Sequence, residues 1–149
     1  LDDNKFEKIP IFPYSVKYNS AFYGPFREAA KSSPNFGDRK TYQMNFKNSE
    51  EAINEVKLDI NEGADVIIIK PAISYLDIIY RIKQKFNVPI IAYNVSGEYT
   101  MVKSASEKNF INGIETILEI LHSIKRSGAN AIISYHALEV AKYLKANDL

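Results

Sequence analysis

The sequence contains no cysteine, so it offers neither disulfides nor thiolate ligands for a metal. Its two histidines, His122 and His136, are weak evidence for a metal site. No apolar run approaches the roughly 18 residues that a membrane-spanning helix needs. The 19 basic and 18 acidic residues give a formal net charge of +1, which favours binding to neither nucleic acid nor an anionic membrane. What is present is an ordinary globular composition, 46% hydrophobic and 25% charged, in a chain of 149 residues that suffices for one compact domain.

The chain begins at Leu1 rather than at an initiator methionine, and residues 1–12 do not resemble a secretory signal. We therefore expect a fragment or a processed product. The default compartment is the cytoplasm, and a plastid location stays open.

Four short segments have the composition of β-strands. Proline weakens the first of them, and the other three are rich in Ile and Val, as strands covered on both faces are. The segments are "IPIFPYSV" (9–16), "DVIIIK" (65–70), "PIIAYNV" (89–95) and "NAIISYH" (130–136).

Helical patterns separate these strands. Apolar residues recur at helical spacing in residues 49–63, 74–86, 110–128 and 137–147, and Ser49 stands at an N-cap position. Gly63 and Gly128 suit the position just after a helix, where the left-handed conformation is common. Alternating strands and helices predict an α/β fold with a parallel sheet and right-handed crossovers. Four such β-α units make either half of a (β/α)₈ TIM barrel or a small doubly wound sheet.

One polar residue stands at or just beyond the carboxyl end of each predicted strand. These residues are Lys17, Lys70, Ser96 and Tyr135. If the sheet is parallel, all four converge on one rim, which is where both candidate folds place their chemistry.

A lysine at a strand end has two interpretations. Its stem can pack on the sheet while its ammonium stays in water, which is the commoner case for a single lysine. Alternatively, it forms a Schiff base with a carbonyl substrate, which requires a neutral amine although the ordinary pKa is about 10.4. Burial and a second nearby lysine both lower that pKa. Two lysines at neighbouring strand ends, Lys17 and Lys70, favour the Schiff base.

The segment after the first strand carries Arg27, Arg39 and Gln43. The arginine fork suits carboxylates, although a solvated surface arginine is the simpler interpretation of either residue alone. The aromatic stretch "FYGPFR" indicates an ordered loop over a pocket. His136 follows Tyr135, so strand alternation points its side chain away from the site and predicts a structural role.

Five blocks in order, "YSVKYNSAFYGPFREAA", "GDRKTYQMN", "EGADVIIIKPAISYLDI", "AYNVSGEYTM" and "SIKRSGANAIISY", closely resemble the porphobilinogen synthase (5-aminolevulinate dehydratase) family. The resemblance runs from about Ile9 to Leu144. It implies a (β/α)₈ barrel enzyme, a hydro-lyase that condenses two molecules of 5-aminolevulinate into porphobilinogen on the route to haem and chlorophyll.

The resemblance also implies residue roles. Lys70 matches the lysine that forms a Schiff base with the P-side substrate, and Lys17 matches the A-side lysine. Arg27, Arg39 and Gln43 fall in blocks that bind the A-side carboxylate. Ser96 and Tyr135 match the residues that bind the P-side carboxylate. Glu55 matches a glutamate that binds an allosteric Mg²⁺ in many members.

The family chain is about twice as long as this sequence, so we expect residues 1–149 to be the C-terminal half of a single barrel domain. The remaining half is then an expected partner that carries a catalytic Zn²⁺ or Mg²⁺, and the full-length protein is expected to form a homo-oligomer, an octamer. Whether the 149 residues alone are active stays open. The alternatives are an inactive half-barrel fragment or scaffold, and another Schiff-base lyase such as an aldolase, although no Gly-rich phosphate loop is present.

Overall fold

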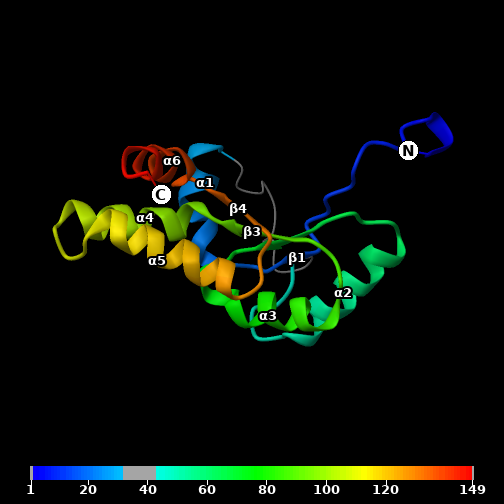
Figure 1. Cartoon of the computed structure of the whole chain (residues 1–149). Helices are drawn as coiled ribbons and strands as arrows, with labels where there is room; N and C mark the ends of the chain where they lie inside the picture. Colours follow the sequence, from blue (N-terminus) through cyan, green and yellow to red (C-terminus); the bar gives the residue numbers. More distant parts are fainter. Residues whose placement is uncertain (1, 32–42, 149) are drawn as a thin grey trace.

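A computed structural model describes residues 2–31 and 43–148 of the chain (Figure 1). The described elements are short 3₁₀ segments, helices and strands. Their order is η1 (Asp2–Asn4), β1 (Val16–Lys17), η2 (Ala21–Tyr23), α1 (Gly24–Ala29), α2 (Glu50–Asn61), β2 (Ile67–Lys70), η4 (Ile73–Tyr75), α3 (Leu76–Lys85), β3 (Ile90–Asn94), α4 (Ser96–Glu107), α5 (Gly113–Arg126), β4 (Ala131–Ser134) and α6 (Ala137–Ala146).

The strands form one four-stranded parallel sheet in the order β1-β2-β3-β4. Each strand therefore pairs with its successor along the chain, as the strands of a barrel do and as those of a doubly wound sheet do not. The predicted set of four parallel β-α units is confirmed. All four carboxyl ends meet at one edge.

The two faces of the sheet differ in burial. The outer face carries Ile67, Ile69, Ile90 and Ala92, all at 0% exposure, under apolar residues from α2, α3 and α5. The inner face is more open, and Ile133 on β4 is 39% exposed. The prediction of strands covered on both faces therefore holds for β2 and is wrong for β4.

The first predicted strand is shorter than expected, because only Val16 and Lys17 have strand geometry. The residues before them still lie along β2, since Ile11 and Pro13 accept backbone hydrogen bonds from Val66 and Ile68. Pro10 and Pro13 have no N–H to donate to a ladder, and the N–H of Ile11 donates to the Asp65 carboxylate at 2.7 Å instead of to the backbone of β2.

The predicted helices are all present, and Gly63 and Gly128 have φ of 98° and 121°, as their positions after a helix require. Ser49 precedes α2 but makes no side-chain cap, and Asn48 accepts the first N–H groups instead. Two helices were not expected from the sequence, α1 and α4. Figure 1 shows α4 running beside α5, with α1 close to its start.

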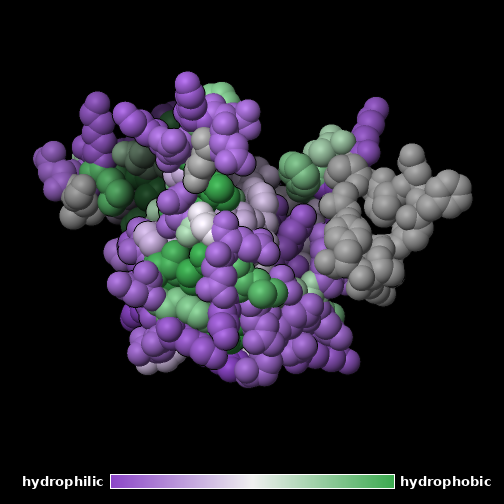
Figure 2. Space-filling model, turned by 90° about the vertical axis from the view of Figure 1, so that its right-hand side faces the viewer, coloured by the Kyte–Doolittle hydropathy of each residue, from purple (hydrophilic) through white to green (hydrophobic). Residues whose placement is uncertain are grey.

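Hydrophobic residues also remain at the surface. Figure 2 shows them from one side as green patches among hydrophilic residues. Several lie on the segment that leads to β1, where Phe6, Ile9 and Tyr14 are each about half exposed. None of the helices within residues 2–31 and 43–148 is both long and apolar enough to cross a bilayer.

Candidate active site

Lys17 and Lys70 are directly paired neighbours in the parallel sheet. The register places Val16 beside Ile69 and Lys17 beside Lys70, at the carboxyl ends of β1 and β2. Adjacent strands lie about 4.8 Å apart, and paired side chains point to the same face. Both lysines are half-buried on the inner face, so the predicted pair of neighbouring lysines is present.

Three tyrosines surround the Lys70 ammonium. Its Nζ lies 4.3 Å from the ring centroid of Tyr93 and 5.3 Å from those of Tyr14 and Tyr23. The Tyr23 hydroxyl donates to the Lys70 carbonyl at 3.2 Å. Cation–π contacts of this kind fix the position of an ammonium group without supplying a counter-charge.

Tyr93 links Lys70 to Tyr135. Its hydroxyl shares a side-chain hydrogen bond with Tyr135, and burial together with that bond raises the pKa of Tyr93 to about 12. Tyr93 therefore keeps its proton at neutral pH. Tyr135 is 46% exposed, so its surface is open to a ligand.

Ser96 begins α4, where it is buried and bonded to a segment distant in sequence. Its Oγ accepts the N–H of Phe26 at 3.1 Å and donates to the carbonyl of Phe22 at 3.4 Å. Gly97 makes this approach possible, because a Cβ there would lie 2.5 Å from the Phe22 carbonyl oxygen. The stretch "FYGPFR" is ordered as predicted, but it is helical in η2 and α1 rather than a loop, and it packs on the start of α4.

Arg27 lies in α1 with its guanidinium carbon 5.4 Å from the Tyr23 ring centroid. Its Nε and Nη2 are buried and find no hydrogen-bond partner among the described residues. Buried donors are normally paired, so these two point to an anionic ligand. This agrees with the prediction that Arg27 binds a carboxylate.

Gln43 is 7% exposed, and neither its amide oxygen nor its amide nitrogen has a partner within the described part of the chain. It lines an open hollow of about 320 Å³ together with Lys17 and Glu55. An amide with unused donors and acceptor beside Lys17 fits the predicted A-side clamp. Arg39 lies outside the described residues.

Glu55 is exposed on α2, with Glu51 one turn earlier on the same hollow. Among the residues that the structure describes, no three His, Asp or Glu side chains gather closely enough to hold a metal ion. A divalent cation at Glu55 would need waters or oxygens from elsewhere to complete its six or more ligands. The magnesium role of Glu55 stays a prediction.

Tyr14, Tyr93 and the buried Glu98 were not singled out from the sequence, and Tyr23 was included only as part of the aromatic stretch "FYGPFR". Tyr93 could have been found, because strand alternation from Ile91 places it on the face that carries Lys70. The partners of Glu98 lie up to 26 residues away in the sequence, and no local pattern marks this residue as buried.

The sheet order and the paired lysines at the strand ends place this protein in the class of (β/α) barrels that have a lysine-bearing site at the carboxyl ends of their strands. Within that class, the chain belongs to the delta-aminolevulinic acid dehydratase family, whose family model matches residues 1–143.

Its relatives include delta-aminolevulinic acid dehydratases of known sequence and structure. The chain is 57% identical over 145 residues to the protein from a Synechocystis species and 56% identical over 144 residues to that from Bacillus subtilis, covering 97% of this chain and 44% of each relative. A crystal structure of the enzyme from Toxoplasma gondii, in complex with its reaction product porphobilinogen, superposes with a TM-score of 0.96 at 46% identity. The superposition covers 100% of this chain and 42% of the Toxoplasma gondii chain.

The chain therefore spans less than half the length of these relatives. The four-stranded sheet is part of a TIM barrel, as predicted. Its assignment as the C-terminal half of one domain stays a prediction, and so do the individual roles of the site residues.

Proposed function

We propose that the full-length protein containing this sequence is a porphobilinogen synthase that condenses two molecules of 5-aminolevulinate. The single observation that carries the proposal is the register pair Lys17 and Lys70 at the inner rim of the sheet. The relatives of this chain are named delta-aminolevulinic acid dehydratase. Two amine–carbonyl condensations need two lysines, and two carboxylate substrates need two anion clamps.

The chemistry at each lysine is imine formation. The neutral amine of Lys70 attacks the ketone carbon of the P-side substrate, and water leaves as the C=N bond forms. Lys17 does the same with the A-side substrate. The aromatic rings of Tyr14, Tyr23 and Tyr93 lie within 5.3 Å of the Lys70 Nζ and help to fix its direction.

The resemblance assigns two anion clamps to residues around the lysine pair. Arg27 and Gln43 have unused buried donors and supply the A-side clamp, which Arg39 completes on the same resemblance. Ser96 and Tyr135 supply the P-side clamp, with Tyr93 orienting the Tyr135 hydroxyl. Because Ser96 now bonds to Phe22 and Phe26, substrate binding would exchange at least one of those bonds.

Further properties of the whole protein rest on the resemblance alone. They are an allosteric Mg²⁺ at Glu55, a catalytic Zn²⁺ or Mg²⁺ on the part of the barrel beyond this chain, assembly as a homo-octamer and a cytoplasmic location. A bound Zn²⁺ or Mg²⁺ would supply Lewis-acid chemistry at the rim.

The direct test is turnover. Purified full-length protein is incubated with 5-aminolevulinate, and porphobilinogen is measured by its colour with Ehrlich's reagent. The proposal expects product from the wild type and none from Lys70→Met. A borohydride-trapped adduct that forms only with a phosphorylated sugar would support an aldolase instead, and absence of any adduct would support an inert scaffold.

A further inference from the structure

A glutamate lies completely buried beneath the rim of the candidate site. Glu98, the third residue of α4, is 0% exposed. Glutamate is almost never fully buried without partners, because burial disfavours its charge. Its partners therefore indicate what it does.

The Glu98 carboxylate accepts four hydrogen bonds from two strand ends. Its Oε1 accepts the backbone N–H groups of Ala72 at 3.1 Å and Ile73 at 2.6 Å. Its Oε2 accepts the N–H of Val95 at 2.7 Å and the side-chain amide of Asn94 at 3.1 Å. One oxygen thus binds the chain just after Lys70, and the other binds the chain just before Ser96.

The network continues to the fourth strand. The Ser134 hydroxyl donates to Asn94 Oδ1 at 2.8 Å and accepts the N–H of His136 at 3.1 Å. Tyr135 lies between Ser134 and His136. A single connected set of hydrogen bonds therefore joins the carboxyl ends of β2, β3 and β4.

These bonds need a group that only accepts. All four donors point at Glu98, and an ionised carboxylate has acceptor sites for all of them and no hydrogen of its own. Burial raises the pKa of Glu98, and the hydrogen bonds from Val95, Ile73, Ala72 and Asn94 oppose that rise. A glutamine there would turn its NH₂ group toward one of the two donor pairs.

We propose that Glu98 is a positioning residue for the reaction, fixing the ends of β2, β3 and β4 so that Lys70, Ser96 and Tyr135 meet one substrate molecule. The inference rests on the proposed function. It does not require Glu98 to touch substrate. Displacements of about 1 Å in a reacting group can cost about 100-fold in rate, so an anchor beneath the lysine matters for turnover.

The test compares Glu98→Gln with Glu107→Gln in the full-length protein. Glu107 is a matched control, because it ends the same helix and is exposed. Two quantities are measured: amide hydrogen exchange in peptides covering residues 71–74 and 94–96, and kcat with 5-aminolevulinate. For Glu98→Gln we expect exchange at least ten-fold faster in one of these two peptides, with the strand amides unchanged, and a fall in kcat of about 100-fold. Glu107→Gln is expected to match the wild type in both.

Two outcomes would overturn the proposal. Unchanged exchange in both peptides would show that Glu98 does not anchor the strand ends. Faster exchange with an unchanged kcat would show that the anchor does not serve the reaction. A wild-type protein without any turnover is a different result, because the proposed function itself then fails whether or not the exchange pattern changes.

If Glu98→Gln does not fold, Ser134→Ala decides. This substitution cuts only the arm of the network that reaches β4. We expect the KM for 5-aminolevulinate to rise several-fold, because Tyr135 is then less firmly held. The rate of borohydride trapping on Lys70 at saturating substrate is expected to stay at the wild-type value. An unchanged KM would overturn the proposal.

Discussion

At the scale of single residues, Lys70 ends a strand of buried isoleucines, yet its ammonium lies among tyrosine rings. The sequence predicts dry surroundings made by Ile and Pro, because those residues are its neighbours in the chain. The structure shows that Tyr14, Tyr23 and Tyr93 surround the amine, from three separate segments. The aromatic surroundings of this strand end therefore come from residues that the fold brings together.

His136 is the residue whose titration should affect stability. It is 2% exposed, its ring centroid lies 4.6 Å from that of Tyr99, and its Nδ1 lies 3.7 Å from Glu139. Glu139 is also the ion-pair partner of Lys103, at 3.2 Å. Burial lowers the pKa of His136 from its ordinary value of 6.5, and Glu139 only partly opposes this.

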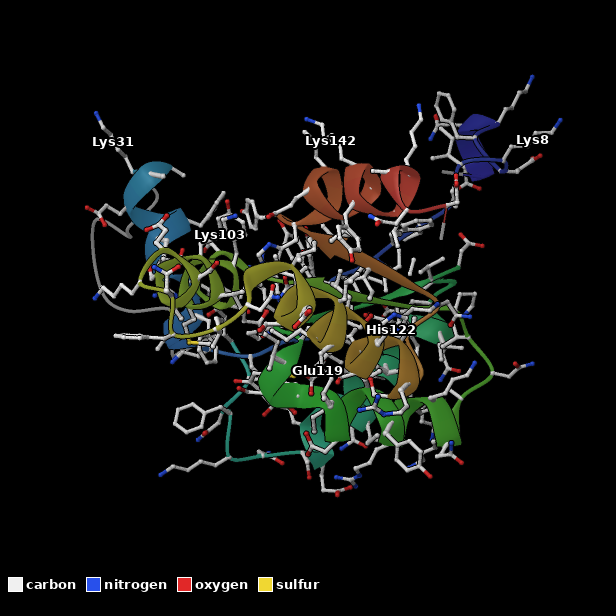
Figure 3. The ribbon with its side chains drawn as sticks, turned by 60° about the vertical axis from the view of Figure 1, so that its left-hand side comes forward. Lys8, Lys31, Lys103, Glu119, His122 and Lys142 are labelled. Atoms are coloured by element: carbon white, nitrogen blue, oxygen red, sulfur yellow. The ribbon has the colours of Figure 1, made fainter. Side chains whose placement is uncertain are left out.

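The direction in which stability changes with pH follows from proton uptake by His136. As pH falls through 6.5, the unfolded chain protonates this histidine while the folded protein does not, so His136 costs stability progressively below that pH. We expect His136→Phe to raise the unfolding temperature relative to the wild type more at pH 5.5 than at pH 7.5, measured by calorimetry on the full-length protein. His122→Phe is the control, because His122 is exposed on α5 (Figure 3) and its side chain meets water in both states. Equal differences at the two pH values for His136→Phe would contradict this assignment.

At the scale of elements, the contact between α4 and the η2–α1 segment positions both Ser96 and Arg27. It depends on Gly97, where a Cβ would meet the Phe22 carbonyl at 2.5 Å and the Phe22 Cα at 2.7 Å. Both are backbone atoms, which cannot rotate away as a side chain can. We expect Gly97→Ala to destabilise the protein by about 1–3 kcal/mol and to lower turnover by displacing Arg27.

The matched control is Gly24→Ala, at the start of α1. Apart from its two chain neighbours, a Cβ there meets nothing within 4 Å, and the residue is already helical with φ of −49°. Alanine is favoured over glycine in a helix by about 0.5–1 kcal/mol, whereas a Cβ just before Pro25 disfavours the helical conformation, so we expect a smaller fall in unfolding temperature than for Gly97→Ala. If thermal unfolding showed the two alanines to be equivalent, Gly97 would not be the contact that joins these elements.

Some of these elements could be predicted from the sequence and others could not. The strands could be predicted because runs such as Ile67–Lys70 are short, β-branched and preceded by a helix-ending Gly63. Helix α4 could not, because it begins directly at a strand end behind Val95, which offers no side-chain cap, and carries Gly97 in its first turn. The lysine pair could be predicted from strand order. The buried state of Glu98 could not, since its donors Ala72 and Ile73 lie 26 and 25 residues away.

For the whole molecule, the main feature is that helices cover one face of the sheet and leave the other face partly exposed. Helices α2, α3 and α5 bury the outer side of β2 and β3, whereas Ile133 and Tyr135 remain exposed on the inner side and at the rim. In the relatives, which are more than twice as long, further chain is available to cover such a face. The 149 residues contain the lysines but leave apolar area in water.

We expect these 149 residues, expressed alone, to associate through the inner face. Light scattering coupled to size exclusion should give a mass above the 16.9 kDa of one chain, rising with concentration. Ile133→Lys should reduce that association, because it places a charge on the exposed face. A monomer with cooperative unfolding at all concentrations would contradict this expectation.

The Schiff base that we propose between Lys70 and 5-aminolevulinate can be trapped by reduction with borohydride. Full-length protein is mixed with the substrate, reduced and digested, and its peptides are weighed by mass spectrometry. We expect a substrate-derived mass increase on the peptide that contains Lys70, and its loss in a folded Lys70→Met protein that makes no porphobilinogen. A Lys70→Met protein that forms porphobilinogen at the wild-type rate would show that this Schiff base is not part of the reaction.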